Sequence, residues 1–347
     1  MAITRVPPVE AEAFGRRLLA RAGFSEANAS AVVDSLIWAE TREVTTHGLQ
    51  RLLDYVERAE NGELDPAADP VVRRSSGAIT VVDGRSAPGQ RAFSVAAAEA
   101  LELARELGVG WVAVGNCSHA GALGFVTEQI AAAGLIGVAL VSSRPTMGYP
   151  GAIGPVVGTN PIAIAVPAAD GIVSFDMSPA SITRGAIKRH RRDGTPLPPG
   201  VAASANGAPT TDPEAATTIL PIGGAKGGVM ALMFEFLGGV LAGAPVLAPA
   251  LAGRNGPMQA GSVVAIDQRV FGDSADGYRE HAEQLLTALR SAPASEPGVS
   301  VRAPGDRARE AAERIQRDGI QVSVGLQRQL DELADRLLVG RLSGVAT

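Results

Sequence analysis

The chain has 347 residues, of which 46% are hydrophobic and 19% charged, and its net charge is −5. This composition suits one large globular domain or two ordinary ones, and no basic stretch with interleaved aromatic residues indicates a nucleic-acid partner. No apolar run is long enough to span a membrane, and the N-terminus lacks a signal-peptide core. The single cysteine, Cys117, excludes a disulfide framework and favours a cytoplasmic protein.

The first 65 residues are predicted to be helical. A proline pair precedes a helix that stops at Gly23, and Ser25 can cap a second helix with an apolar stripe. A third helix follows Thr46 and ends at Gly62, with its leucines on one face.

From about residue 75 the pattern changes to short β-branched runs bounded by Gly, Pro or Asn, which predict strands. These runs are "AITVVDG", "VGWVAV", "IGVALVSS", "IAIAVP", "GIVSFDM" and "GSVVAID". Helical stretches separate some of them, and "AKGGVMALMFEFLGGVLAG" is apolar nearly all round, which predicts a buried helix. Residues 193–218 are predicted to form a long surface loop, and residues 291–300 a flexible connection.

After residue 305 the chain is predicted to be helical again. The order of helical, mixed and helical segments predicts an α+β fold with two domains. Residues 1–74 and 305–347 would form one discontinuous helical domain, and residues 75–304 an inserted mixed α/β domain.

The chain has four histidines, and three of them have ordinary explanations. His281 lies on a polar helical face, and His190 lies in the basic run "KRHRRDG", where a solvated loop is favoured over a phosphate contact. His119 follows a predicted strand and precedes a helix, which suits phosphate binding, although a plain turn explains it equally well. The dinucleotide fingerprint is absent, because Gly108 and Gly110 precede that strand rather than follow it.

The fourth histidine, His47, lies in "TREVTTHGLQRLLDYV". A helix that begins at Thr45 or Thr46 would place His47 in its first turn and Arg51 one turn later on the same face. That arrangement suits a small carboxylate, which Arg51 would bind with two hydrogen bonds while His47 handles a proton. A threonine cap with a surface histidine and a solvated arginine explains these residues better when they are taken alone.

Other candidate motifs are negative. Lys226 in "LPIGGAKGGVMALM" does not meet the P-loop pattern, which disfavours ATP hydrolysis. No cluster of carboxylates and histidines predicts a metal site.

Seven stretches, taken together, resemble one family of enzymes. They are "THGLQR", "GVGWVAVGNCSHAG", "GTNPIAIAVP", "FDMSPASITRG", "PTTDP", "LPIGGAKGGVMALMFEFLGGVLAG" and "RAPGDR". Their order and spacing resemble the malate/L-lactate/sulfolactate dehydrogenase-like oxidoreductases over about residues 1–320. This non-Rossmann family also contains ureidoglycolate dehydrogenase, 2,3-diketogulonate reductase and the Δ1-piperideine-2-carboxylate/Δ1-pyrroline-2-carboxylate reductases.

The resemblance implies a homodimeric NAD(P)-dependent enzyme. It would transfer a hydride to or from the α-carbon of a small 2-oxo or 2-hydroxy acid. A cyclic-imine reductase is the alternative, and a catalytically inactive binding subunit is a lesser one. The basic residues of 188–192 can meet a 2′-phosphate, which slightly favours NADP, but a solvated loop explains them equally well.

The resemblance also implies roles for single residues. His47 would be the proton donor in reduction and the base in oxidation, Thr46 would orient it, and Arg51 would hold the substrate carboxylate. Thr159 would contact the substrate, and Lys226 would lie near it. The residues implied for the cofactor are His119, Ala120, Gly121, Ala122, Leu123, Asp176, Met177, Ser178, Arg184, Pro304, Gly305, Asp306 and Arg307.

The chain departs from the family pattern in three places. Ala120 stands where an aromatic residue is common, and Val201 and Ser204 replace a tryptophan and an aspartate. If these residues line the pocket, a specialised metabolite is favoured over malate, and cyclic imines remain open.

Overall fold

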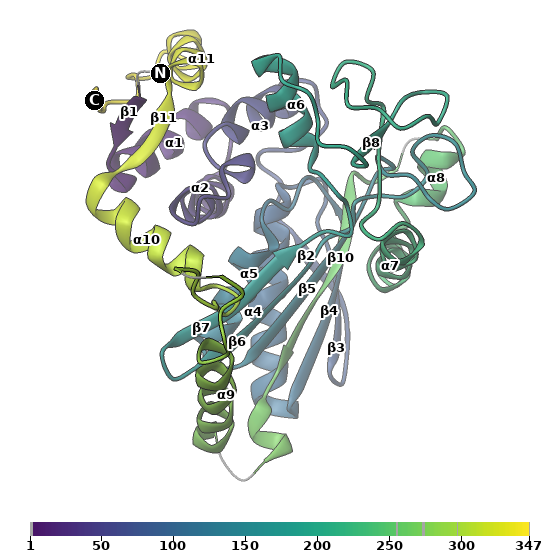
Figure 1. Ribbon diagram of the computed structural model, residues 1–347, viewed down its shortest axis with the longest axis vertical. Helices are drawn as coiled ribbons and strands as arrows, with labels where there is room; N and C mark the ends of the chain where they lie inside the picture. The colour runs from purple at the N-terminus through teal and green to yellow at the C-terminus, as the bar shows by residue number, and fades with distance from the viewer. Residues whose placement is uncertain (1–2, 255, 273–274, 297, 347) are drawn as a thin grey trace.

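A seven-stranded mixed sheet forms the centre of the computed structural model, which describes residues 3–254, 256–272, 275–296 and 298–346 (Figure 1). In spatial order its strands are β2 (Val71–Ser76), β3 (Ile79–Asp83), β4 (Val109–Cys117), β10 (Gln259–Ile266), β5 (Ile136–Ser143), β6 (Ile162–Ala168) and β7 (Gly171–Met177). Strands β3 and β4 pair in parallel, and the other neighbours in the sheet pair antiparallel. The six predicted strands are confirmed, whereas β2 was missed because its polar sequence "VVRRSS" suits an edge strand and lacks the expected apolar run.

Two helices, α4 (Gly89–Leu107) and α5 (Leu123–Ala132), pack against the sheet and share one apolar cluster with it. Alanines on α4 allow a close approach to the sheet. At Gly110 of β4, an added Cβ would lie 2.3 Å from the carbonyl oxygen of Ala100, so only glycine fits. Some of the many glycines therefore serve close packing rather than turns.

Both ends of the chain meet in a second layer of helices. These are α1 (Pro8–Arg21), α2 (Glu26–Thr41), α3 (Arg51–Glu60), α10 (Asp306–Asp318) and α11 (Val324–Arg336). One apolar cluster joins residues between Val6 and Leu64 with residues between Ile315 and Leu342. The predicted cap of α2 is confirmed, because the Ser25 hydroxyl accepts the Asn28 N–H at 3.3 Å.

The prediction that both ends are purely helical is wrong. Strand β1 (Ile3–Val6) lies between β11 (Ile320–Ser323) and β12 (Val345–Ala346) in a small antiparallel sheet. These strands are two to four residues long, and their partners come from opposite ends of the chain. Neither their length nor their pairing gives a periodic signal in the sequence.

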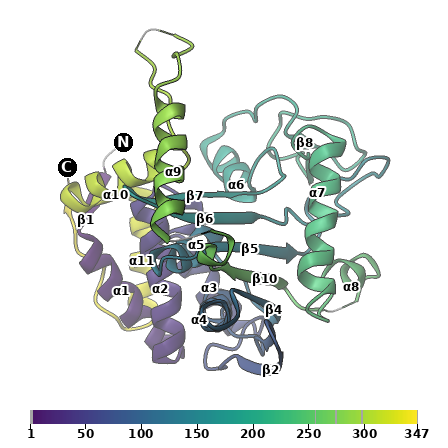
Figure 2. The same cartoon turned by 90° about the horizontal axis from the view of Figure 1, so that it is seen from below.

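A third group of elements lies at one end of the large sheet (Figure 2). It contains α6 (Arg184–Asp193), β8 (Ala202–Ala203), β9 (Thr218–Ile219), α7 (Ala225–Glu235), the π-helical turn η2 (Phe236–Val240) and α8 (Leu247–Leu251). Residues 193–218 are not simply a surface loop, because Leu197 and Ala202 are buried in a third apolar cluster. The basic run around His190 lies on α6, not in a loop.

The prediction that residues 225–243 form a wholly buried helix is wrong for this chain alone. One face of α7 and η2 is buried, and its members are Gly227, Gly228, Ala231, Glu235, Gly238 and Gly239. The other face is exposed, with Met233 at 50% and Phe236 at 51%. Its further apolar members are Val229, Met230, Leu237, Val240 and Leu241, and we call these seven residues the α7 apolar face.

The remaining helix, α9 (Ala275–Arg290), follows β10 and the short turn η3 (Gln268–Phe271) and extends beside β6. It projects from the body in Figure 2. The connection from α9 to α10 carries no helix or strand over residues 291–296 and 298–305.

Candidate active site

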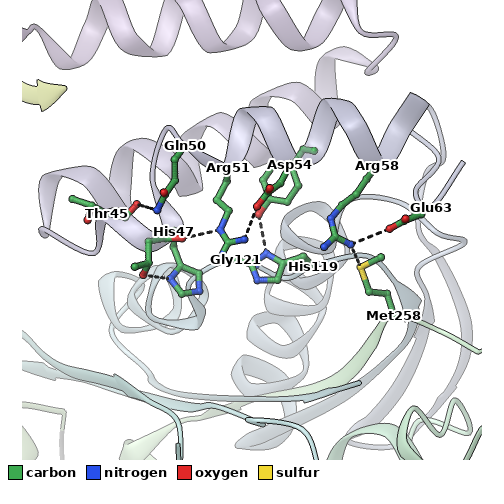
Figure 3. Close-up of polar contacts among 12 residues, drawn as sticks. Thr45, His47, Gln50, Arg51, Asp54, Arg58, Glu63, His119, Gly121 and Met258 are labelled. Carbon is green, nitrogen blue, oxygen red and sulfur yellow. Dashed lines mark hydrogen bonds and ion pairs between the residues drawn. The ribbon is translucent and has the colours of Figure 1, made fainter. Parts of the chain in front are cut away.

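His47 lies in the 3-10 turn η1 (Thr45–His47), and α3 begins only at Arg51. The prediction that both residues share the first two turns of one helix is therefore wrong. Gly48 interrupts the helix with an extended backbone, at φ −91° and ψ −152°. The turn nevertheless brings His47 and Arg51 to the same place, as Figure 3 shows.

Arg51 is held in place by the protein on two sides. Its Nε donates to the carbonyl oxygen of Thr46 at 2.7 Å, and its Nη1 forms an ion pair with Asp54 Oδ2 at 2.7 Å. Within the described residues these contacts engage Nε and one Nη1 proton, so the Nη2 edge is available to a ligand. An anchored guanidinium of this kind can bind a carboxylate with two hydrogen bonds.

His119 lies on the turn between β4 and α5, and its ring stacks on that of His47. The ring centroids are 5.7 Å apart, and the planes differ by 16°. These two histidines lie far apart in the chain, and no local pattern predicts that they meet. The site therefore contains two facing imidazoles where the sequence suggested one.

A chain of hydrogen bonds fixes the proton of His119. The backbone N–H of Gly121 donates to His119 Nδ1 at 3.2 Å, and the Tyr55 hydroxyl lies 2.9 Å from the same atom. Gln90 Nε2 donates to the Tyr55 oxygen at 2.5 Å, which leaves the hydroxyl proton directed at His119. Because Nδ1 accepts, the neutral ring carries its proton on Nε2 and is a hydrogen-bond donor there.

Both imidazoles are neutral at pH 7 in this environment. Burial, with a smaller contribution from the Arg51 guanidinium, lowers the pKa of His47 to about 4. Burial, with Arg51 and His47, holds the pKa of His119 well below its usual value. Burial also raises the pKa of Tyr55 to about 12, so its hydroxyl stays protonated.

Thr46 lies where the sequence predicted an orienting group. Its hydroxyl is 3.1 Å from His47 Nδ1. The start of α6 packs against this turn, because a Cβ added to Gly185 would lie 3.0 Å from Thr46 Cγ2. The side chain of the neighbouring Arg184 is exposed at this helix start.

The turn from His119 to Leu123 adjoins the end of β7. The Asp176 carboxylate accepts the N–H of Gly124 at 2.9 Å and that of Leu123. The side chains of Ala120 and Leu123 are buried, so this turn offers a ligand its backbone more than its side chains. Met177, the next residue of β7, is 60% exposed.

The sequence left a phosphate contact and a plain turn equally open at this helix start, and the Asp176 carboxylate that lies there disfavours a phosphate. A second negative group beside its carboxylate would be repelled. A carboxylate acceptor suits hydroxyl or amide donors instead, such as those of a ribose or a carboxamide.

The "PGDR" turn lies further back along β7. A Cβ added to Gly305 would lie 3.2 Å from the backbone nitrogen of Ser174. The Asp306 carboxylate accepts from Arg290 Nη2 at 2.8 Å and Arg309 Nη2 at 3.0 Å, and it accepts a backbone N–H. Asp306 thus holds the turn in shape, while Arg307 is exposed beside it.

Thr159 precedes Asn160, a buried asparagine that joins two elements, and Lys226 lies on α7, one of those elements. Asn160 accepts the Ser143 N–H at 2.9 Å and donates to the carbonyl oxygen of Ala231 on α7 at 2.8 Å. Thr159 is half-buried and Lys226 is exposed. Neither forms a hydrogen bond or ion pair with the two stacked histidines or Arg51 within the described residues.

The three departures from the family pattern have separate environments. Ala120 is buried next to His119, and its N–H donates to Gln259 Oε1 at 2.6 Å. Val201 packs on the third apolar cluster, and the Ser204 hydroxyl donates to Ala208 O at 3.0 Å within a turn. Of the three, only Ala120 adjoins the stacked histidines.

In the part of the chain that the structure describes, no three His, Cys, Asp or Glu side chains are grouped to hold a metal ion. Over the same ranges no helix has the length and apolarity needed to cross a membrane.

The chain is a dehydrogenase or reductase of hydroxy acids, oxo acids or cyclic imino acids, as the relatives that its sequence matches are. The sequence matches the malate/L-lactate dehydrogenase family over residues 6–331, and the chain belongs to that family. The family expected from the motifs is thereby confirmed, and it implies a nicotinamide cofactor.

Two curated relatives and one solved structure illustrate the range of the family. The chain is 34% identical to Δ1-pyrroline-2-carboxylate reductase 1 of Burkholderia ambifaria, over 94% of this chain and 96% of the relative. It is 30% identical to malate/(S)-sulfolactate dehydrogenase of Methanothermus fervidus, over 96% of this chain and 98% of the relative. Malate dehydrogenase of Pyrococcus horikoshii has a TM-score of 0.90 at 26% identity, covering 98% and 97% of the two chains.

Proposed function

We propose that the chain transfers a hydride between NAD(P)H and the α-carbon of a small 2-oxo or 2-hydroxy carboxylic acid, with His47 as the acid and base. The observation that carries the proposal is the convergence of the Arg51 guanidinium with the stacked His47 and His119 rings. A substrate panel of oxo acids, hydroxy acids and cyclic imines, run with both cofactors, tests it. The absence of turnover with every oxo and hydroxy acid would overturn it.

In this mechanism each protein group has a separate task. Arg51 binds the carboxylate through its Nη2 edge, which orients the neighbouring carbonyl carbon. His119 donates a hydrogen bond from Nε2 to the carbonyl oxygen, and His47 delivers the proton to that oxygen. The bound nicotinamide supplies the hydride in reduction and accepts it in oxidation. A bound carboxylate offsets the charge of Arg51 and so raises the pKa of His47 toward the value a proton donor needs.

The pH dependence follows from the lowered pKa of His47. Oxidation requires the neutral ring, so kcat/KM for the hydroxy acid should be flat above the pKa of about 4 and fall below it. The acid limb of kcat should lie at higher pH than that of kcat/KM, because the bound carboxylate offsets the charge of Arg51 and raises the pKa of His47. Initial rates between pH 4 and 8, corrected for ionisation of the substrate, measure both limbs. A kcat/KM limb at the ordinary histidine value would contradict the lowered pKa of His47.

A second candidate function is reduction of a cyclic imino acid. The lowered pKa values of His47 and His119 favour it. A protonated iminium already carries its proton, so its reduction needs no protonated histidine as a donor. The Burkholderia ambifaria relative, whose name gives this activity, also supports it. Preferred turnover of Δ1-pyrroline- or Δ1-piperideine-2-carboxylate in the panel would select this function. Failure to bind NADH and NADPH would instead favour an inactive binding subunit.

The proposed cofactor preference is slightly for NADP. Arg191 pairs with Glu214 at 3.0 Å and Arg192 with Asp193 at 2.9 Å, so these two cations have partners on the protein. Lys188 and Arg189 are exposed on α6, and the preference rests on them. Titration of the wild-type protein with each reduced cofactor decides it.

The proposed domain division is residues 1–74 with 305–347, and residues 75–304. The apolar cluster shared by both chain ends supports it. The pairing of β2 with β3 favours a boundary just before Val71. A cytoplasmic location is also proposed, and it rests on the single buried thiol of Cys117.

We also propose that the enzyme is a homodimer assembled through the α7 apolar face. An exposed apolar surface of this kind is unusual on a monomer and typical of an interface. Phe236→Glu would bury a charge there and should weaken dimerisation by at least about 30-fold, as expected for a hot-spot loss of about 2 kcal/mol. Sedimentation equilibrium measures the association constant.

Phe271→Glu is the matched control, because Phe271 is 80% exposed and lies on η3, outside the α7 apolar face. It should leave the association constant within about threefold of the wild-type value, since most surface substitutions change little. A monomeric wild-type protein, or a dimer disrupted by Phe271→Glu alone, would contradict the assignment.

A further inference from the structure

Glu40, in the last turn of α2, is a buried carboxyl group beside the turn that carries His47. It is 5% exposed, and its Oε1 accepts the backbone N–H of Leu49 at 2.7 Å. A carboxyl group is rarely buried without a compensating partner, and here the partner is the backbone itself. Leu49 is 1% exposed, so its N–H would lose a hydrogen bond without Glu40.

Glu40 also explains why a glycine follows His47. The backbone angles of Gly48, φ −91° and ψ −152°, are open to any residue, so conformation does not require glycine there. An added Cβ, however, would lie 2.0 Å from Glu40 Oε1 and 2.4 Å from Glu40 Cδ. Glycine is therefore required because the carboxyl group packs directly on the turn.

The contact lies between the two groups that act on the substrate. The His47 N–H donates to the Val44 carbonyl oxygen at 2.9 Å, and the Arg51 N–H donates to the Gly48 carbonyl oxygen at 2.9 Å. These two hydrogen bonds close backbone turns on either side of Leu49. Fixing Leu49 thus fixes where η1 ends and α3 begins.

We propose that Glu40 is a positioning residue that holds the His47 imidazole and the Arg51 guanidinium at the separation needed for catalysis. This inference rests on the proposed function, because it assigns those two groups to the reaction. Glu40 acts through the backbone of Leu49 and Gly48 and has no contact with the substrate in this role.

The role requires a hydrogen-bond acceptor rather than a charge. Burial raises the pKa of Glu40 to about 7, opposed by the Leu49 N–H, so the carboxyl group is partly protonated at neutral pH. A glutamine amide oxygen can accept the same N–H in nearly the same volume. Leucine fills the volume without an acceptor.

The first test compares Glu40→Gln with Glu40→Leu. Glu40→Leu should lower kcat per cofactor-binding site by roughly 10- to 100-fold, the cost of a displacement of about 1 Å. The dissociation constant of the reduced cofactor should stay unchanged, and hydrogen exchange of the Leu49 amide should accelerate. Glu40→Gln should keep kcat within about threefold, since the hydrogen bond is retained. Wild-type kcat in Glu40→Leu, or an equal loss in both variants, would overturn the proposal.

A second test uses Gly48→Ala in two backgrounds. In the wild type the added methyl group collides with Glu40 and should lower kcat at least about tenfold. In Glu40→Ala the space is vacant, so the same methyl group should lower kcat much less. The effects of the two substitutions on kcat should therefore be strongly non-additive. Additive effects would overturn the proposal.

The two proposals fail in distinguishable ways. Undiminished turnover in His47→Ala would remove the acid–base role of His47. Hydrogen exchange of the Leu49 amide reports the Glu40 contact without any substrate, and so does the cycle of Gly48→Ala and Glu40→Ala when thermal unfolding is its readout. Unchanged Leu49 exchange in Glu40→Leu, or an additive cycle, would overturn the positioning role alone.

Discussion

Replacing His47 by alanine is expected to lower kcat by roughly two to four orders of magnitude, the range of general acid–base catalysis. Thr46 Oγ1 lies 3.1 Å from Nδ1 of the ring, which leaves Nε2 to exchange a proton with the substrate. KM should change little, because Arg51 still binds the carboxylate. Steady-state and single-turnover rates of reduced-cofactor oxidation, with the best substrate of the panel, measure the loss.

The stacked partner His119 provides the informative comparison. In the proposed mechanism it contributes only a hydrogen bond from Nε2, so His119→Ala should lower kcat by about tenfold, a smaller loss than that of His47→Ala. A larger loss in His119→Ala would exchange the two assignments and make His119 the acid and base. His281→Ala is the control, because His281 is exposed on α9 and far from both rings in sequence and in fold.

Local signals in the sequence were reliable where a residue's own neighbours decide the structure. The Ser25 cap and the six apolar strand runs were predicted because capping and strand formation depend on short-range chemistry. The α7 apolar face shows the limit of this approach. An apolar helix has the same sequence pattern whether its own chain or a partner covers it.

Long-range contacts account for most of what the sequence could not predict in the site. The stacking of His47 on His119, and the Gln90–Tyr55 pair behind it, join three segments that only the fold brings together. Tyr55 had one available signal, since it lies four residues after Arg51 on the same helix face. Its apolar neighbours made it look like an ordinary core residue.

The helix start at α5 shows how one distant residue can reverse a local inference. The dipole argument left an anion site and a plain turn equally open there, and the anion that is present is the carboxylate of Asp176 from β7. The physical rule was correct, and the identity of the anion was not predictable from the turn alone. The site therefore separates its charges, with the Asp176 carboxylate at the start of α5 and the Arg51 guanidinium beside His47.

Arg51→Ala should raise KM for carboxylate substrates by roughly 100-fold, because a charge-assisted hydrogen bond contributes about 1.5–3 kcal/mol. The same change removes the cation that lowers the pKa of His47, so the acid limb of kcat/KM should move up from about 4. Arg51→Lys keeps the positive charge but lacks the planar guanidinium. It should leave the acid limb of kcat/KM in place and raise KM less than Arg51→Ala does. Arg105→Ala, which removes an exposed guanidinium in the last turn of α4, should leave KM within about threefold. An unchanged KM in Arg51→Ala, or a limb that does not move, would show that this guanidinium acts on neither the substrate nor His47.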